Sequence, residues 1–201
     1  MQSERARADV GCLLIEDTKP GTACLSGLRA AMEAAGMAVG EFRLTCAARL
    51  HERLQEAYYE VRRRCAAPTI AALGRAGCIA ALALAEQLPA ERIALIGGAN
   101  DDAPARRRSL PGPFERLRGF AMRNLTFCTA DILLIEPEGV ETALPARRLA
   151  AVRGRLTAAS MTVERERALS PQARWAVLNF LQSGELPKSL AENAEMCIIY
   201  G

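Results

Sequence analysis

The sequence predicts an α/β protein, a three-layer αβα sandwich around a mostly parallel, doubly wound sheet of about six strands. Two observations predict it. Short continuous apolar runs recur along the chain, as in strands buried on both faces, and stretches with helical spacing lie between them. One run, at residues 69–73, meets a corner of small residues at 74–77 and passes directly into an Ala/Leu-rich segment. Such alternation requires a parallel sheet covered by helices on both faces, with right-handed crossovers.

Length and composition indicate a single domain over residues 1–201, with a core at 10–183 and a tail at 184–201. The net charge of +3 comes from 26 basic and 23 acidic side chains, a balance that argues against a nucleic-acid partner. No apolar run reaches the roughly 18 residues that a membrane span needs. The charged N-terminus lacks the apolar stretch of a signal peptide, and the seven cysteines include no C-x-x-C pair. We therefore expect a cytoplasmic protein with reduced cysteines, no membrane contact and no nucleic acid.

The first half of the chain predicts three strand–helix pairs. Apolar residues repeat at helical spacing as far as Gly36, a residue type favoured just beyond a helix end. A long amphipathic pattern follows the second strand, with arginine and glutamate on its outer face. The expected strands are residues 10–15, 37–45 and 69–73, and the expected helices are residues 23–35, 47–65 and 77–88.

The second half predicts three more pairs. Ser170 followed by Pro171 is typical of a helix start, because serine caps the first amides and proline fits the first turn. Residues 99–113 form a long polar stretch that suits a flap or a small cap, and the tail can add a short edge strand at 196–200. The expected strands are residues 92–98, 131–135 and 156–163, and the expected helices are residues 114–125, 142–152 and 170–181.

Residues 72–80, Ala-Leu-Gly-Arg-Ala-Gly-Cys-Ile-Ala, have the strand–turn–helix layout of a nucleophile elbow, which normally reads G-x-S-x-G. With this elbow and its surrounding units, the chain resembles the small, lidless α/β-hydrolases of the carboxylesterase and monoglyceride-lipase type over about residues 10–183. The resemblance begins at the strand that the family counts third. The serine of the elbow is missing. If the motif is aligned on the helix, Gly74 occupies the serine position, and if it is aligned on the first glycine, Ala76 occupies it. The elbow is degenerate.

The resemblance also implies places for the remaining members of a Ser-His-Asp triad. The family's acid can follow either of two strands, which makes Asp101, Asp102, Glu136 and Glu138 candidates. The family's histidine belongs in the loop at residues 164–169, and here that loop contains none. The resemblance therefore implies a fold that has lost its usual reaction.

Other side chains could in principle supply chemistry. Cys78 stands near the start of the elbow helix, where a thiol pKa falls, although the helical pattern points it inward as a packing residue. Paired carboxylates, such as Asp101 with Glu136, could do acid–base work. His51, the only histidine, begins the second helix, away from the elbow in the family's geometry. The candidate catalytic residues are therefore Cys78, Asp102 and Glu136.

The carboxyl ends of the strands meet at one edge, where ligands of such sheets bind near the topological switch point. At this edge the family commonly has a His-Gly dipeptide, and this chain has Glu16-Asp17. We expect ligand contacts from Asp17, Gly74, Arg75 and Ala76, with Arg75 exposed as the main positive charge. A single histidine leaves no usual zinc ligand set, and the G-x-x-G turn lacks the full dinucleotide pattern, so no metal and no cofactor are expected.

These observations predict a pseudo-hydrolase: an α/β-hydrolase-fold protein without the triad that binds a small-molecule ligand or a partner. The alternative is a hydrolase of small ester or acyl substrates with a non-standard nucleophile. A third alternative is a structural subunit, since a pseudo-enzyme surface can become the interface of a homo-oligomer.

Overall fold

The computed structural model describes residues 7–17, 25–44, 49–97, 128–137, 156–161 and 169–186. The expected helices at 114–125 and 142–152, the polar stretch at 99–113 and the tail strand at 196–200 lie outside these residues.

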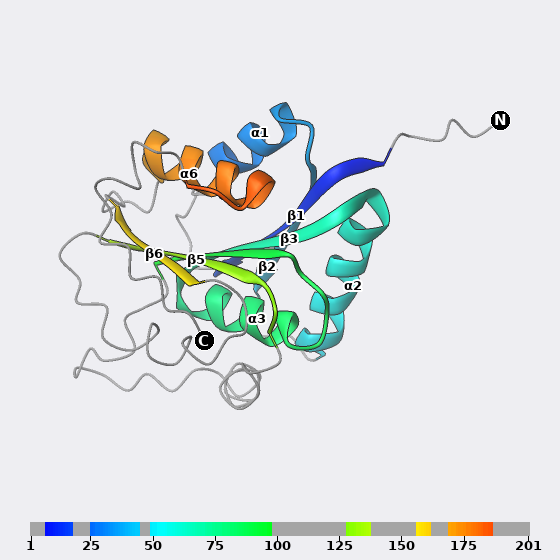
Figure 1. Ribbon diagram of the computed structural model, residues 1–201. Helices are drawn as coiled ribbons and strands as arrows, with labels where there is room; N and C mark the ends of the chain where they lie inside the picture. Colours follow the sequence, from blue (N-terminus) through cyan, green and yellow to red (C-terminus); the bar gives the residue numbers. More distant parts are fainter. Residues whose placement is uncertain are drawn as a thin grey trace, which may run out of the picture.

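Within the described part, six strands form one sheet in the order β2-β1-β3-β4-β5-β6, and every neighbouring pair is parallel (Figure 1). The α/β class and the parallel sheet predicted from the sequence are therefore confirmed. The strands are β1 (Ala8–Asp17), β2 (Ala38–Leu44), β3 (Cys65–Leu73), β4 (Arg92–Ile96), β5 (Asp131–Pro137) and β6 (Leu156–Met161).

Four described helices cover the sheet: α1 (Ser26–Ala34), α2 (Leu50–Arg64), α3 (Gly74–Ala85) and α6 (Pro171–Ser183). Helices α1 and α6 lie on one face, and α2 and α3 lie on the other (Figure 1). The result is a three-layer αβα sandwich, as predicted.

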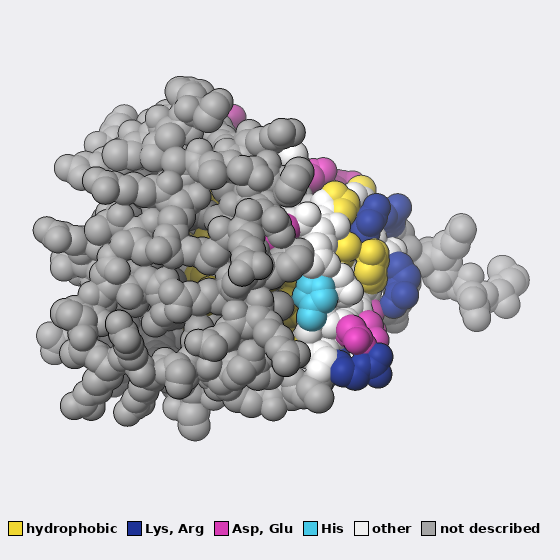
Figure 2. Space-filling view, turned by 90° about the horizontal axis from the view of Figure 1, so that it is seen from below, with side chains coloured by type: hydrophobic (Ala, Val, Ile, Leu, Met, Phe, Trp, Pro, Cys, Tyr) yellow, Lys and Arg dark blue, Asp and Glu magenta, His cyan; other side chains and the backbone are white. Residues whose placement is uncertain are grey.

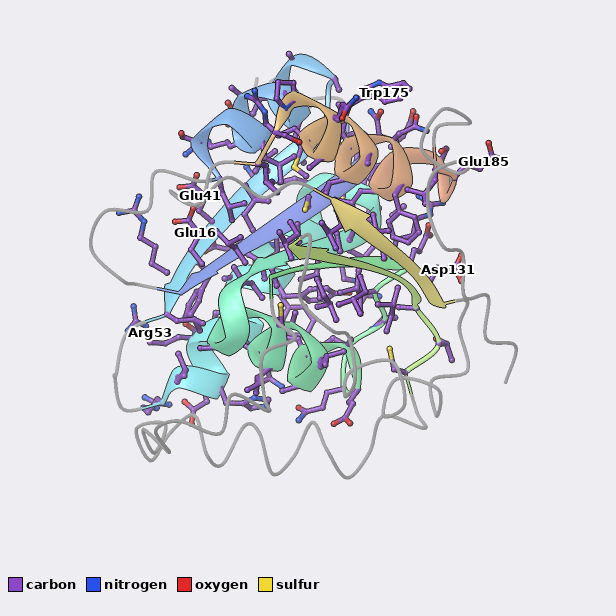
Figure 3. The ribbon with its side chains drawn as sticks, turned by 90° about the vertical axis from the view of Figure 1, so that its left-hand side faces the viewer. Glu16, Glu41, Arg53, Asp131, Trp175 and Glu185 are labelled. Carbon is purple, nitrogen blue, oxygen red and sulfur yellow. The ribbon has the colours of Figure 1, made fainter. Side chains whose placement is uncertain are left out.

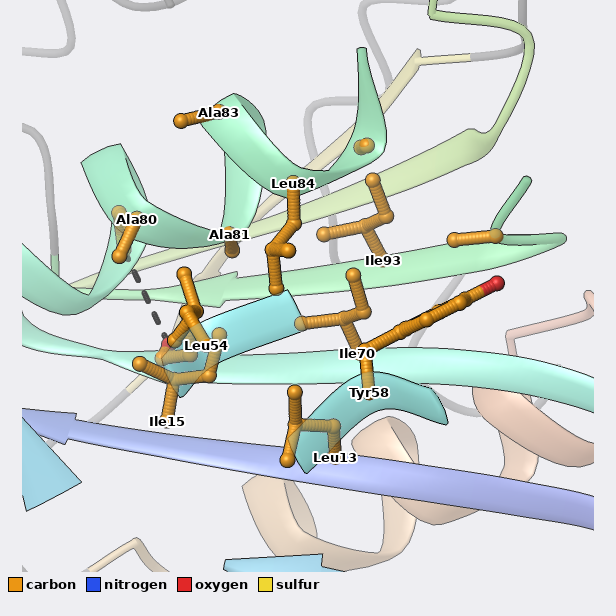
Figure 4. Close-up of a cluster of buried hydrophobic side chains, with 14 of the residues drawn as sticks. Leu13, Ile15, Leu54, Tyr58, Ile70, Ala80, Ala81, Ala83, Leu84 and Ile93 are labelled. Atoms are coloured by element: carbon orange, nitrogen blue, oxygen red, sulfur yellow. Dashed lines mark hydrogen bonds between the residues drawn. The ribbon is translucent and has the colours of Figure 1, made fainter. Parts of the chain in front are cut away.

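Strand β1 shows why its sequence is an unbroken apolar run. Leu13 and Ile15 pack beneath α2 and α3 with Tyr58, in the cluster of Figure 4. Cys12 and Leu14 point to the opposite face and pack with residues of α1 and α6. All four β1 side chains are fully buried, so alternate residues fill two separate cores.

Several element boundaries differ from the prediction by a few residues, and those of β3 and α3 bear on the site. Strand β3 begins at Cys65, where the sequence pattern continues the preceding helix, and it includes Pro68. At Pro68, β3 pairs only with β1, because its pairing with β4 starts at Ile70. The missing N–H of proline therefore costs no hydrogen bond between β3 and β4. Helix α3 begins at Gly74, not at residue 77, because the chain turns immediately at the end of β3.

The predicted start of the last helix is confirmed. The Ser170 hydroxyl accepts a hydrogen bond from the Ala173 N–H at 3.1 Å, and Pro171 occupies the first helical position. Gly184 ends α6 with a φ of 78°. That left-handed conformation favours glycine.

The face shown in Figure 2 carries basic and acidic side chains close together over its described part. Exposed ion pairs occur on helices of both layers, with Arg49 and Glu52 at the start of α2 and Arg29 and Glu33 on α1. Exposed pairs of this kind contribute little stability, so the two buried cores carry the fold.

Tyr58 gives the stability a predictable pH dependence. Its hydroxyl donates to the Pro89 carbonyl, and burial raises the pKa of Tyr58 from 10.0 to about 12. Above pH 10 the unfolded chain loses this proton before the folded chain does, so stability falls between pH 10 and about 12. Urea unfolding across that range tests this: Tyr58→Phe should be less stable at neutral pH by about 1 kcal/mol and lose stability less steeply with pH.

Tyr59→Phe is the matched control, because the Tyr59 side chain is 43% exposed. It should keep the wild-type pH dependence. An unchanged pH dependence in Tyr58→Phe would contradict the assignment.

Candidate functional site

The sheet has its topological switch point between β1 and β3. From β1 the chain passes through α1 to β2 on one side, and then through α2 to β3 on the other side of β1. The β1–β3 pairing ends at Glu16 opposite Leu73, and the β3–β4 pairing ends at Leu73 opposite Ile96. The carboxyl ends of these strands therefore share one edge, where ligands of open α/β sheets bind.

The elbow turn follows Leu73 without any intervening loop. Leu73 is extended, with φ −116° and ψ 134°, and Gly74 has a φ of 75° and is the first residue of α3. A side chain at such a φ is strained, as the nucleophile of an elbow is. The strained position of this elbow is thus Gly74 and not Ala76. Of the two alignments that the sequence allows, the backbone favours the one through the helix.

A second glycine allows α3 to approach the sheet closely. A Cβ added to Gly77 would lie 3.1 Å from the carbonyl oxygen of Ile15 in β1. That distance is tighter than ordinary packing, so the absence of a side chain lets the first turn of α3 lie against β1. The two glycines together place the start of α3 directly beside the end of β1.

The first turn of α3 offers backbone N–H groups without a side-chain cap. Within the described turn, the N-cap residue Leu73 makes no side-chain hydrogen bond, and no acidic residue follows it. The positive end of the helix dipole lies at the same place. The turn can therefore donate hydrogen bonds to an oxygen atom in the crevice.

Two of the four expected ligand-binding residues meet at this switch point. Asp17 and Gly74 directly follow the last paired residues of neighbouring strands, Glu16 and Leu73. Ala76 belongs to the same helical turn and is 4% exposed. For Asp17 and Arg75 the structure describes the backbone alone, so the exposure expected for Arg75 stays a prediction.

The candidate Cys78 is a buried thiol on the inner side of α3. Its side chain is 6% exposed, and its Sγ lies 3.8 Å from the Ala72 carbonyl oxygen and 3.9 Å from that of Ile96. It packs in the core cluster under α2 and α3. A nucleophile must be reached by its substrate, so this placement favours the packing interpretation over the catalytic one.

Of the other candidates, the structure describes the backbone of Glu136 and the side chain of His51. Asp102 lies outside the described residues. Glu136 is near the end of β5, which β4 separates from β3, so its backbone lies about 10 Å from the elbow. His51 is on α2, where its Nε2 lies 2.9 Å from Oε1 of Gln87.

Glu16 is a charged residue of this edge whose role the sequence reasoning missed. Its Oε1 accepts the Leu25 N–H at 3.2 Å, and its Oε2 lies 3.6 Å from Nε of Arg43. The side chain is only 15% exposed, and Figure 3 shows Glu16 at the end of the sheet opposite to Asp131. It therefore fixes the start of α1 to the end of β1. An acidic residue at a strand end, one loop before a helix, was the signal available in the sequence.

Among the described residues, no three histidine, cysteine, aspartate or glutamate side chains gather as metal ligands would. None of the described helices is long and apolar enough to cross a bilayer.

No protein-family model and no curated protein matches the sequence. Solved structures do match. One was reported with the metagenome-derived lipolytic enzymes LipS and LipT: 15% identity, a TM-score of 0.56, and coverage of 79% of this chain and 85% of that one. The esterase domain of a Rhodothermus marinus protein has 18% identity and a TM-score of 0.60, and the match covers 86% of this chain and 84% of that chain. Est1E from Butyrivibrio proteoclasticus has 9% identity and a TM-score of 0.60, and the match covers 91% of this chain and 89% of that chain.

These likenesses define the class of fold. The chain has the α/β-hydrolase fold, and the solved structures it resembles include lipolytic enzymes and esterases. The resemblance inferred from the elbow and the succession of strand–helix units is confirmed at the level of the fold. At 9 to 18% identity the likeness shows nothing finer.

The strain at Gly74 predicts a graded response to substitution. Gly74→Ala should lower the free energy of unfolding by about 1 kcal/mol, because a Cβ disfavours the left-handed backbone. Gly74→Asn should lower it less, because asparagine tolerates that conformation. Urea denaturation measures both. Equal stability of Gly74→Ala and the wild type would mean that this turn carries no such strain.

Proposed function

We propose that the protein is a pseudo-hydrolase, which binds a small-molecule ligand at the switch point without cleaving it. The observation that carries this proposal is the elbow: the strained position that would present a nucleophile is Gly74, a residue with no side chain. A turn of this shape with a glycine at its apex retains backbone donors and lacks a group that could form a covalent intermediate.

The position of the only histidine supports the same proposal. Activation of a serine or cysteine nucleophile requires a base within hydrogen-bond reach, commonly histidine. His51 instead lies on α2, and its ring contacts Gln87 just beyond α3. A triad built from this chain alone would lack its base at the elbow.

The ligand would lie against the first turn of α3. The N–H groups of that turn suit an oxygen atom of the ligand, and the backbones of Asp17 and Gly74 adjoin at the same place. We infer that Asp17, Arg75 and Ala76 border the crevice, with the Arg75 guanidinium as its positive charge. A ligand with a carbonyl or carboxylate group would match these donors.

A hydrolase of small esters or acyl compounds is the alternative, favoured by the esterase and lipase structures that share the fold. It would need a non-standard nucleophile, with Cys78 as the candidate on α3, or a residue from a second copy in a homo-oligomer. We also infer a cytoplasmic location, because Cys12, Cys65, Cys78 and Cys128 are buried thiols outside any disulfide.

Covalent labelling tests the proposal. The purified protein is treated with a fluorophosphonate probe and, separately, with iodoacetamide, and adducts are read by intact mass beside a short-chain ester turnover assay. We expect no fluorophosphonate adduct, no rapid alkylation of the folded protein and no turnover, because the elbow holds no reactive side chain.

The matched control is Cys78→Ala, whose labelling and turnover should equal those of the wild type. Rapid single-site labelling with turnover would contradict the proposal. Loss of that activity in Cys78→Ala would assign the nucleophile to Cys78.

A further inference from the structure

A cavity of about 580 Å³ lies at the amino-terminal edge of the sheet, opposite the switch point. The starts of β3, β4 and β5 and the last turn of α2 contribute to its wall. Figure 3 shows Asp131, which lines it, at the opposite end of the sheet from Glu16. We call it the amino-edge pocket, lined among others by Arg62, Pro68, Pro89, Glu91, Arg92 and Asp131.

The wall of the amino-edge pocket is held by hydrogen bonds among its own residues. The Glu91 N–H donates to the Pro68 carbonyl at 3.0 Å, and the Asp131 N–H donates to the Glu91 carbonyl at 3.0 Å. The buried Tyr58 hydroxyl donates to the carbonyl of Pro89. The strand starts and the loop before β4 are therefore fixed before any ligand arrives, which lowers the cost of ordering a site.

The two arginines of the pocket differ in what they bind. Nη1 of Arg92 donates to the carbonyls of Leu181 and Gln182 at 2.8 and 2.9 Å, so it serves the end of α6. The guanidinium of Arg62 has no hydrogen bond or ion pair among the described residues; the hydrogen bond at Arg62 is accepted by its backbone carbonyl, from Arg7. Arg62 is thus available to a ligand carboxylate.

The opposite charge is present in the same pocket. Glu91 and Asp131 line it together with Arg62, and the Glu91 side chain remains 52% exposed beside Arg92 at 3.6 Å. A ligand with a single negative charge would meet these two carboxylates as well as the arginine. A ligand with both charges would satisfy both signs at once.

We propose that the amino-edge pocket binds a small zwitterion of the α-amino acid class. Arg62 takes the carboxylate and Glu91 takes the ammonium group. Pro68, Pro89 and Ala90 line the apolar part of the wall and favour an apolar side chain on the ligand. This site is separate from the elbow and does not depend on the proposed function there.

Three probes with the same isobutyl side chain test the proposal by ligand-observed NMR and calorimetry on the full chain. They are L-leucine, 4-methylpentanoate, which lacks the ammonium group, and 3-methylbutylamine, which lacks the carboxylate. L-Leucine should bind at millimolar concentration, and each singly charged probe should bind at least about tenfold more weakly, because it makes only one of the two charged contacts with the wall.

Arg62→Gln should weaken L-leucine binding by about tenfold or more through loss of the charged contact. Arg63→Gln is the matched control, because Arg63 lies next to Arg62 in the same turn of α2 and is exposed outside the pocket wall. It should bind as the wild type does. Three results would overturn the proposal: no L-leucine binding, equal binding of 4-methylpentanoate, or equal effects of the two substitutions.

Discussion

The turn at Gly74 is the constraint on which the rest of the structure depends. A strand, β3, ends and a helix, α3, begins within one residue, and this requires the φ of 75° that glycine adopts most easily. Gly77 then allows α3 to lie against the carbonyl of Ile15. The end of β1, the end of β3 and the start of α3 are thereby brought to one place. These close contacts form the switch point at which we propose that the ligand binds.

The same turn is the basis of the proposed pseudo-hydrolase. The backbone presents an apex, a helix start with available N–H groups and a neighbouring strand end, yet the apex carries no side chain. Cys78 lies inside the core and His51 contacts Gln87, so neither supplies a reactive pair at the apex. The carboxylate of Glu16, at the end of β1, anchors the start of α1. A binding role follows more directly from this arrangement than a catalytic one.

Much of the fold follows from local sequence signals, because burial and capping act over short distances. The apolar run around Leu13 and Leu14 predicted a strand buried on both faces, and Ser170 before Pro171 predicted a capped helix start. The site was less predictable. Which residue of the elbow is strained depends on where α3 starts, and the anchoring by Glu16 depends on where the start of α1 lies relative to the end of β1. The amino-edge pocket joins segments far apart in the chain, which no local pattern reveals.

We propose that this turn keeps the backbone geometry of a nucleophile elbow and carries no reactive side chain. The most direct test is to place a thiol at its apex with Gly74→Cys and to measure the rate of iodoacetamide alkylation against pH. The account predicts rapid alkylation with a thiol pKa below the ordinary value of about 8.5, because the start of α3 stabilises the thiolate. Slow alkylation, or a pKa at or above the ordinary value, would mean that residue 74 does not face an accessible helix start, and would contradict the account.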